Sequence, residues 1–436
     1  MEMIPALDGL WARTASSAPA TSAMAQDTEA DVAVVGAGFT GLSAALHMAQ
    51  AGARVTVLDA AAIGQGGSGR NVGLVNAGLW LMPDDLESRL GPDRGPRLLA
   101  ALGDGPALVW DLVHNHAIDC QAVANGTLHC AHGPDGLDAL RARAAQWQRR
   151  GVAVRLLERD ETVGRIGSAA FAAALMDPRA GTIQPLAYAR GLARAAMDAG
   201  AVIHTHSPVT ACAPAPPPQG HAAPGWQLQT PGGTLRAARV LVATNTYSAA
   251  AGAPQRTHQS VLPYFNLATA PLPEKVRETV LPGGEGCWDT AKILTSFRMD
   301  AEGRLILGSV GALGAVDGAV HRGWARRRLR QLFPALADMS FECAWHGRIG
   351  NTPDALPRFH QPGPGMWSIS GYNGRGIAPG TVFGQMLARL ALGETGPEAI
   401  PLPLHAAPRP DPMRHLREAY WRTGSAIWHL AGARVV

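Results

Sequence analysis

The pattern of apolar and polar positions near the N-terminus predicts a strand, a helix and a second strand. Residues Asp31 to Val35 form a short apolar run of the kind found in buried strands. Leu42 to Ala51 have the small and apolar residues of a packed helix, and Arg54 to Leu58 form a second strand that ends in Asp59. This order predicts a βαβ unit of the kind from which α/β domains are built.

The patterns farther along the chain indicate mixed α and β structure. Residues 136–150 place apolar side chains on one face of a helix. Residues 293–299 and 304–310 alternate between apolar and polar side chains, as antiparallel strands do. The Pro-rich stretch 214–225 is expected to form an exposed loop between two short strands.

The turn between the first strand and the helix carries a G-x-G-x-x-G motif. Gly36 permits the tight turn, Gly38 allows the backbone to approach a pyrophosphate, and Gly41 lets the helix pack closely on the strand. The N-terminus of the helix offers unpaired N–H groups and a partial positive charge to that pyrophosphate. Asp59 is placed to accept hydrogen bonds from a ribose hydroxyl. The motif therefore predicts a dinucleotide site, for FAD or NAD equally.

A second glycine-rich loop, Gly64 to Gly78, follows the second strand and favours a flavin. It reads GQGGSGRNVGLVNAG. A flexible linker is the alternative, although such linkers rarely carry an Arg-Asn pair at their centre. In this loop the sequence resembles the D-amino-acid-oxidase-type FAD-dependent oxidoreductases, and most closely the γ-glutamylputrescine-oxidase-like amine oxidases. In that family an S-G-R-N-x-G loop lies against the flavin end of FAD, and the matching residues here are Ser68, Gly69, Arg70, Asn71 and Gly73.

The resemblance extends over nearly the whole chain. It implies that Val209 meets the adenine side of FAD through its backbone, and that Ala243 and Thr244 form a turn beside the cofactor. Residues 345–359 and 371–392 match the closing signature, whose last helix points its N-terminus at the flavin pyrimidine ring in the family. The cofactor-binding residues that the motif and the resemblance imply are Gly36, Gly38, Phe39, Thr40, Gly41, Asp59, Ser68, Gly69, Arg70, Asn71, Gly73, Val209, Ala243, Thr244, Gly374, Arg375, Gly376 and Ile377.

The resemblance also implies the fold class. It is α/β, with a Rossmann-like, glutathione-reductase-like FAD-binding domain and an α+β substrate domain built on an antiparallel sheet. A chain of 436 residues exceeds what one core normally supports, which agrees with two intertwined domains. The expected bounds are 28–84, 165–252 and 345–396 for the discontinuous FAD-binding domain, 85–164 and 253–344 for the substrate domain, 1–27 for an N-terminal extension and 397–436 for a C-terminal tail.

The composition is that of an ordinary soluble globular protein, at 47% hydrophobic and 17% charged residues. No apolar run is long enough to cross a bilayer, and residues 1–30 lack the basic and apolar regions of a signal peptide. The five cysteines are scattered and never form C-x-x-C. We therefore expect a cytoplasmic protein without a membrane span, a disulfide framework or a bound metal.

The net charge of +4 does not indicate a nucleic-acid partner. The only lysines are Lys275 and Lys292, and the arginines are spread along the chain. One arginine cluster, residues 322–333, includes apolar residues at helical spacing, which indicates the solvated face of a packed helix. The basic stripe typical of nucleic-acid binding is absent from the sequence.

The resemblance implies an enzyme that oxidises an amine or amino acid. In such enzymes the lone pair of the neutral nitrogen assists hydride transfer from the adjacent C–H to flavin N5. The imine hydrolyses, and O₂ is the expected electron acceptor. This chemistry needs orientation, desolvation and charge placement more than an acid–base pair. The alternatives are a flavoenzyme of different chemistry, such as a monooxygenase or an RNA-modification-type enzyme, and a non-catalytic FAD-binding subunit.

Three residues near the closing signature are candidates for catalysis. Arg375 and the N-terminus of the helix near Gly376 are placed to stabilise negative charge on flavin N1 and O2. A structural ion pair is the alternative for Arg375, as neutralisation of the pyrophosphate is for Arg70. Tyr372 and His346 are candidate pocket residues, with core packing as the alternative. Further aromatic or polar candidates are Tyr264, Phe265, Trp288, Phe297 and Asn373.

The sequence departs from the family where simple amino acids are held. Members that oxidise α-amino acids often have an arginine four residues after the tryptophan that is Trp345 here, but this position is Ile349. The arginine is Arg348, and a shift of one residue on a strand turns a side chain to the other face. A larger amine is therefore favoured. Lysine activates O₂ in related enzymes, and Lys292 is the only lysine near the expected position.

We predict that the purified protein is yellow and that its flavin is released by trichloroacetic acid. Monomeric sarcosine oxidases link their flavin to a cysteine seven residues before an aspartate that corresponds to Asp354, and this position is Gly347 here. FAD is therefore expected to be non-covalent. The absorbance spectra of the acid supernatant and of the pellet test this, and a flavin that stays with the polypeptide contradicts it.

Overall fold

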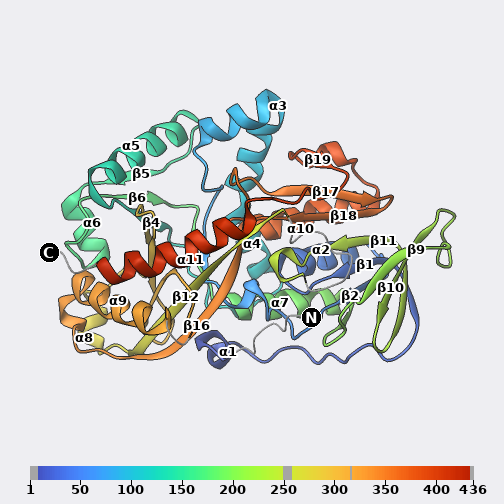
Figure 1. The fold of residues 1–436 in the computed structure, drawn as a ribbon, viewed down its shortest axis with the longest axis horizontal. Coiled ribbons are helices and arrows are strands. Elements are labelled where there is room, and N and C mark those ends of the chain that lie inside the picture. The colour runs from blue at the N-terminus through green and yellow to red at the C-terminus, as the bar shows by residue number, and fades with distance from the viewer. Residues whose placement is uncertain (1–7, 249–257, 315–316, 433–436) are drawn as a thin grey trace.

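The chain builds two large sheets, one mainly parallel and one mainly antiparallel (Figure 1). The computed structural model describes residues 8–248, 258–314 and 317–432. The ends of the predicted N-terminal extension and C-terminal tail (1–7 and 433–436), and the predicted domain boundary at 252/253, lie outside the described residues. The two sheets confirm the predicted fold class, which combines a Rossmann-like part with a part built on an antiparallel sheet.

The βαβ unit that the apolar pattern predicts is present in the mainly parallel sheet. Strands β1 (Thr28–Val35) and β2 (Val55–Leu58) pair in parallel, and helix α2 (Phe39–Gln50) connects them. The strand order is β19-β17-β18-β11-β1-β2-β8. The bounds of the other strands in this order are β8 (Val202–His204), β11 (Gly233–Val242), β17 (Arg358–Gly363), β18 (Met366–Ser370) and β19 (Leu404–His405).

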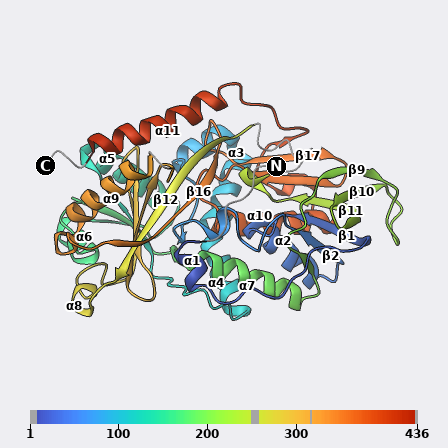
Figure 2. The ribbon, with the colours of Figure 1, turned by 60° about the horizontal axis from the view of Figure 1, so that its bottom comes forward.

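Two further helices, α7 (Pro185–Asp198) and α10 (Ala378–Leu392), pack against α2 beside this sheet (Figure 2). The hydroxyl of Ser43 on α2 donates a 2.8 Å hydrogen bond to the carbonyl oxygen of Thr381 on α10. The helices therefore hold the glycine-rich turn between them.

The predicted Pro-rich loop joins β9 (Ala211–Ala215) to β10 (Gly225–Thr230) and is mostly exposed.

The second sheet has the order β16-β12-β15-β14-β13-β4-β6-β5 and is mainly antiparallel. The predicted antiparallel pair is present as β14 and β15. The bounds are β4 (Thr127–Cys130), β5 (Arg155–Leu157), β6 (Ala174–Asp177), β12 (Ser260–Pro271), β13 (Gly286–Asp289), β14 (Thr295–Met299), β15 (Arg304–Val310) and β16 (Phe341–Asn351). A small pair of strands, β3 (Leu74–Val75) and β7 (Gly181–Thr182), lies apart from both sheets.

The helices on this side have the amphipathic pattern read from the sequence. The predicted helix at 136–150 is α5, and it buries Leu140, Ala144 and Trp147. The arginine-rich segment forms α9, which buries Trp324 and Leu329 as predicted. The bounds are α3 (Pro83–Gly103), α4 (Gly105–Asn115), α5 (Gly133–Arg149), α6 (Arg159–Ile166), α8 (Glu274–Arg277) and α9 (Asp317–Leu332).

The strands cross the predicted domain bounds at three places. β6 pairs with β4, and β16 pairs with β12, so both strands belong to the antiparallel sheet. Their residues fall wholly or partly in the ranges 165–252 and 345–396, which were assigned to the FAD-binding domain. The predicted C-terminal tail supplies β19, which pairs with β17 at the edge of the mainly parallel sheet. Backbone pairing between segments far apart in the sequence decides these memberships, and local patterns do not encode it. The bounds themselves stay a prediction.

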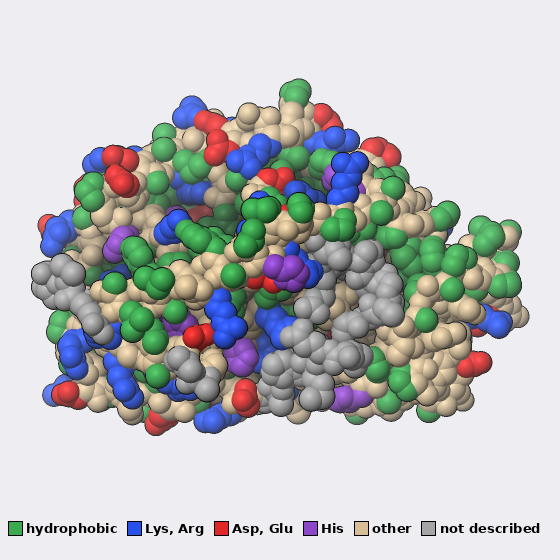
Figure 3. Space-filling view, viewed as in Figure 1, with side chains coloured by type: hydrophobic (Ala, Val, Ile, Leu, Met, Phe, Trp, Pro, Cys, Tyr) green, Lys and Arg blue, Asp and Glu red, His purple; other side chains and the backbone are tan. Residues whose placement is uncertain are grey.

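The tail then forms α11 (Arg414–Ala431), which lies along the antiparallel sheet beside β12 and α9 (Figure 2). The buried hydroxyl of Ser425 and the imidazole of His429 face the protein, and His429 Nδ1 lies 2.7 Å from His321 Nδ1 of α9. Hydrophobic side chains are exposed along this helix in the space-filling view of Figure 3. They include Leu416, Tyr420, Ile427, Trp428 and Leu430.

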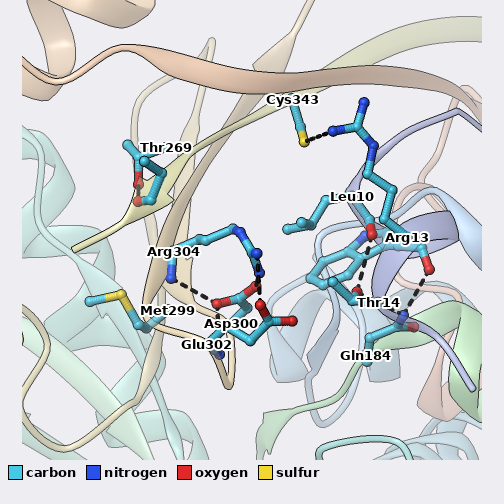
Figure 4. Close-up of polar contacts among 12 residues, drawn as sticks. Leu10, Arg13, Thr14, Gln184, Thr269, Met299, Asp300, Glu302, Arg304 and Cys343 are labelled. Atoms are coloured by element: carbon cyan, nitrogen blue, oxygen red, sulfur yellow. Dashed lines mark hydrogen bonds and ion pairs between the residues drawn. The ribbon is translucent and has the colours of Figure 1, made fainter.

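The N-terminal extension packs against the protein from its first described residues. Helix α1 (Leu10–Thr14) buries Trp11, whose indole Nε1 donates a 2.8 Å hydrogen bond to the carbonyl oxygen of Asn71. Gln184 Nε2 donates to the carbonyl oxygen of Trp11 and to Thr14 Oγ1, and Arg13 reaches Cys343 (Figure 4). The extension therefore supports the second glycine-rich loop from behind.

We predict that Trp11→Ala lowers the free energy of unfolding by roughly 3–5 kcal/mol, the usual cost of truncating a buried tryptophan. The loss also leaves the Asn71 carbonyl oxygen without its donor, so FAD retention should fall. Arg13→Ala, on the same helix, is the comparison: its exposed side chain makes one hydrogen bond, to Cys343 Sγ, so its removal should cost much less. Urea unfolding of both variants tests this, and equal stabilities contradict the supporting role of α1.

Candidate active site

A cavity of about 370 Å³ lies between the two sheets, and residues of both sheets line it. One end, which we call the nucleotide half, is lined by Val35, Leu58 and Val242 at the carboxyl ends of β1, β2 and β11. The other end, the aromatic half, is lined by Tyr264 and Trp288 of the antiparallel sheet. Ligands of open α/β sheets bind at the carboxyl ends of the strands, which agrees with this position.

The glycine-rich turn has the geometry that its glycines require. Gly36 has a φ of +110°, which side chains rarely adopt, and it turns the chain from β1 toward α2. A side chain at Gly41 would collide with the carbonyl oxygen of Gly36, so the helix packs directly on the turn. The Phe39 peptide N–H donates a 3.1 Å hydrogen bond to Ser68 Oγ. The predicted residues that line the cavity here are Gly36, Gly38, Phe39 and Thr40, whereas Gly41 lies outside it.

Asp59 lines the nucleotide half at the end of β2, as predicted. Its Oδ2 accepts a 2.6 Å hydrogen bond from the Ala37 peptide N–H, and its Oδ1 accepts a 2.8 Å bond from that of Ala61. Loss of water around the carboxyl group raises the pKa of Asp59 to about 6, although these two N–H groups act in the opposite direction. The group is therefore a fixed carboxylate at neutral pH, with lone pairs left for a ribose hydroxyl.

Only some motif residues of the second glycine-rich loop line the cavity. Asn71 Nδ2 donates to the carbonyl oxygens of Gly67 and Ser68, and Asn71 Oδ1 accepts from the Gly73 peptide N–H. These bonds close the loop on itself, and Ser68 and Asn71 line the cavity. Gly69, Arg70 and Gly73 do not line it, and their role in cofactor binding stays a prediction.

Arg70 is buried and faces the protein behind the loop. Its Nε donates a 2.8 Å hydrogen bond to the Gln65 carbonyl oxygen, and its Nη1 donates a 3.2 Å bond to the carbonyl oxygen of His346. Its own carbonyl oxygen accepts hydrogen bonds from Asn266 Nδ2 and Trp345 Nε1. The residue therefore connects the loop to β12 and β16.

The other residues that the resemblance implies are brought to the same cavity. Val209, Ala243 and Thr244 line it, although they belong to segments far from the glycine-rich turn. Gly374, with a φ of +85°, leads the chain toward the N-terminus of α10. Gly374, Gly376 and Ile377 also line the cavity, so the start of α10 faces the cavity with its unpaired N–H groups.

The structure separates the predicted catalytic residues Tyr372 and His346. Tyr372 lines the cavity, but its hydroxyl lies 2.7 Å from Thr40 Oγ1 at the start of α2 and is engaged there. Burial also raises the pKa of Tyr372. His346 is exposed and lies outside the cavity lining, which corrects its assignment to the pocket. On β16 the side chains of neighbouring residues point to opposite faces, and Trp345 takes the buried face.

Arg375 lines the cavity and is only 8% exposed, so the surface alternative is wrong. Its Nη1 donates a 2.9 Å hydrogen bond to the carbonyl oxygen of Ala77. The guanidinium carbon lies 4.7 Å from the ring centre of Trp80 and 5.2 Å from that of Trp288. Burial lowers the pKa of Arg375, and the charge of Arg143 adds to this effect.

The residues at which the sequence differs from the family pattern lie in or next to the cavity. Ile349 lines the cavity beside Gly374, where an α-amino-acid oxidase often has its arginine. Arg348 lines the cavity too, and its peptide N–H donates a 2.8 Å bond to the Tyr247 hydroxyl. A side chain at Gly347 would overlap the Tyr264 ring, so this position has no room for a linking cysteine. Lys292 Nζ donates a 2.7 Å hydrogen bond to the Tyr420 hydroxyl on α11.

Sequence reasoning missed two tryptophans of the cavity. Trp80 follows the second glycine-rich loop, and an isolated tryptophan directly after a cofactor loop was the available signal. Trp421 comes from α11 in what was expected to be a tail. Nothing local marks Trp421, because it reaches the cavity only through the docking of α11. Tyr264 and Trp288, which the sequence named as candidates, line the cavity.

A strand, a glycine turn, a helix N-terminus and a terminal acid that meet at one cavity define a dinucleotide-binding oxidoreductase. A family profile described as "DAO: FAD dependent oxidoreductase" matches residues 31–390. The chain belongs to this family. It is a FAD-dependent oxidoreductase of the amine and amino-acid oxidase type.

Relatives of known sequence agree with this assignment. The chain is 32% identical over 387 residues to "Probable oxidoreductase OrdL" of Rhizobium meliloti (strain 1021), covering 86% of each chain. It is 29% identical over 367 residues to "Gamma-glutamylputrescine oxidoreductase" of Escherichia coli (strain K12), covering 84% of each. The glycine oxidase structure from Geobacillus kaustophilus has a TM-score of 0.67 at 24% identity, covering 84% of this chain and 96% of that one, and shows the shared fold.

FAD is the cofactor, and the residues of the nucleotide half fit it. Gly36 and Gly38 line the cavity with backbone alone, as a pyrophosphate site requires, and Asp59 supplies the fixed acceptor for a ribose. Across the described ranges, no group of three or more His, Cys, Asp or Glu side chains has the arrangement of a metal site. Within the same ranges, no helix has the length and apolar character to cross a membrane.

We predict that Asp59→Ala weakens FAD binding by roughly 10- to 150-fold, because a charge-assisted hydrogen bond is worth roughly 1.5–3 kcal/mol. In the native protein FAD affinity should fall as the pH drops below about 6, where the raised pKa of Asp59 lets the carboxylate take up a proton. Asp31→Ala, in the middle of β1 and outside the cavity lining, is the matched control. Fluorescence titration with FAD between pH 5 and 8 measures both effects, and an unchanged affinity in Asp59→Ala shows that the fingerprint is misassigned.

Proposed function

We propose that this protein oxidises the C–N bond of an amine or amino acid to an imine, by hydride transfer to flavin N5 and with O₂ as the electron acceptor. The observation that supports this best is one continuous cavity, in which the half that suits FAD opens directly into a half with aromatic walls. FAD, when bound, supplies the hydride acceptor. We further propose that FAD is held without a covalent link, which the lack of space at Gly347 supports.

The aromatic half is suited to orient a substrate and to exclude water from it. Trp80 and Trp288 flank Arg375 on this side, and Tyr264 and Leu262 of β12 add apolar surface. Burial raises the pKa of Tyr264 well above its ordinary value, so its hydroxyl stays neutral and can donate a hydrogen bond. Such walls fix the reacting C–H bond relative to the cofactor, which is the main requirement of this chemistry.

The charges around the aromatic half favour the neutral form of an amine. Arg375, Arg348 and Lys292 line the cavity on this side. Asp59, in the nucleotide half, is the one carboxylate among the described residues that line the cavity. Positive charge nearby disfavours a protonated nitrogen and lowers the pKa of a bound amine. The residues thus hold the substrate nitrogen with its lone pair available, without a general base.

The prediction that tests this function is anaerobic bleaching of the flavin band by a panel of primary amines and amino acids. At least one amine should reduce the flavin, and admission of air should restore the band with release of hydrogen peroxide. tert-Butylamine, which has no hydrogen on the carbon next to nitrogen, is the control and should leave the spectrum unchanged.

Three other outcomes would lead to different conclusions. Flavin that no amine reduces, but that NADH or NADPH does, indicates a flavoenzyme of different chemistry. Flavin that nothing reduces indicates a non-catalytic FAD-binding subunit. Reduction by an amine without reoxidation by air leaves the amine chemistry intact and replaces O₂ by another electron acceptor.

A further inference from the structure

Helix α11 and the residue before it present apolar side chains to the outside of the protein. Of the nine large hydrophobic side chains that are exposed in the described part of the chain, six belong to residues 413–430. Leu416 is 63% exposed and Ile427 is 61% exposed. Steps of three, four and seven residues place most of these side chains on one side of the helix. We call the six residues the apolar stripe: Met413, Leu416, Tyr420, Ile427, Trp428 and Leu430.

The inner side of α11 is polar, although a packed helix usually turns its apolar side inward. The buried residues of α11 are Ser425 and His429. The imidazole of His429 stacks on Trp324 of α9 with 4.0 Å between ring centres, and Arg422 pairs with Asp317 of α9 at 3.0 Å. Polar contacts therefore attach the helix, and the apolar stripe faces outward. A contiguous exposed apolar surface of this kind marks an interaction site.

Three exposed arginines of α9, which we call the arginine row, are Arg322, Arg326 and Arg330. They are four residues apart, so they lie on one side of the helix. Within the described ranges, no carboxylate pairs with any of the three. Like charges at this spacing destabilise a helix. The row therefore indicates a negatively charged partner outside the chain.

The apolar stripe and the arginine row belong to one face of the protein. Helices α9 and α11 are in contact, and the Nδ1 atoms of His321 and His429 lie 2.7 Å apart between them. Figure 3 shows hydrophobic side chains along α11 and Lys or Arg side chains over α9 on the same face. Lys292, which lines the cavity, donates a 2.7 Å hydrogen bond to the Tyr420 hydroxyl. This face therefore adjoins the candidate active site.

We propose that the apolar stripe and the arginine row together bind the surface of an anionic lipid bilayer. The apolar side chains enter the boundary between headgroups and acyl chains, and the arginines bind headgroup phosphates. Tyr420 and Trp428 are of the two residue types that are enriched at this depth. The other sides of α11 carry charged residues, so the helix lies in the plane of the surface and does not cross it.

The charge of the arginine row favours a lipid surface over a second copy of this chain. Two copies that met through this face would bring their arginine rows to the same interface, and like charges there cost affinity. A bilayer with anionic lipids provides negative headgroups and an apolar layer in one plane. It therefore matches both the arginine row and the apolar stripe.

The test is co-sedimentation of the FAD-loaded protein with lipid vesicles of two compositions. One kind is phosphatidylcholine alone, and the other is an equal mixture of phosphatidylcholine and phosphatidylglycerol. The protein should bind the mixed vesicles much more tightly than the neutral ones, and added salt should weaken this binding because it screens the arginines. No binding to the mixed vesicles, or equal binding to both kinds, would overturn the inference.

Variants then locate the lipid-binding face. Ile427→Gln should weaken binding to the mixed vesicles by roughly tenfold or more, the effect of losing one buried aliphatic side chain. Arg326→Gln should weaken it roughly fivefold, the usual contribution of one basic residue near an anionic surface. Leu404→Gln on β19 and Arg94→Gln on α3 change exposed residues of similar type elsewhere and are the matched controls. Flavin content and urea unfolding show whether each variant is folded. If the controls weaken binding as much as the two variants, the inference is wrong.

Sedimentation velocity without vesicles separates lipid from a second copy of this chain. The protein should show the same oligomeric state before and after Ile427→Gln. A dimer that this substitution dissociates, together with no binding to mixed vesicles, assigns the apolar stripe to a second copy and contradicts the inference. Neither measurement needs turnover, so the inference and the proposed function can fail separately.

Discussion

The rest of the structure depends on the hydrogen bonds around one buried residue, Arg70. Its guanidinium donates to the carbonyl oxygens of Gln65 and His346, and its carbonyl oxygen accepts from Asn266 and Trp345. Because Arg70 is buried, each bond left unmade would cost about 1–3 kcal/mol. The glycine-rich loop is thus fixed to the antiparallel sheet independently of any ligand, and the two sheets keep one relative position.

This constraint explains why the site belongs to neither sheet alone. The mainly parallel sheet provides Asp59 and the turn at Gly36, which recognise a nucleotide by backbone and carboxylate. The antiparallel sheet provides Tyr264 and Trp288, which line the other half of the cavity with aromatic surface. A family can therefore keep its cofactor chemistry while exchanging its substrates, since different strands carry the two tasks.

The parts of the site that could be predicted are those that a short segment determines by itself. Gly36 and Asp59 were found because the turn and the acid belong to one βαβ unit with a fixed spacing. His346 was misplaced because a strand pattern does not tell which face meets a cavity. Trp421 was missed because its position depends on how α11 docks on β12, a contact between distant segments.

The C-terminal segment restricts how far the two sheets can move apart. Its strand β19 is paired into the mainly parallel sheet, and α11 is anchored on the other side by Glu418, which accepts a bond from the Val261 peptide N–H, and by Arg422, which pairs with Asp317. The same helix places Trp421 in the cavity wall. The chain therefore forms a strap across both sheets, and a hinge motion that parts them must first unpair β19 or lift α11.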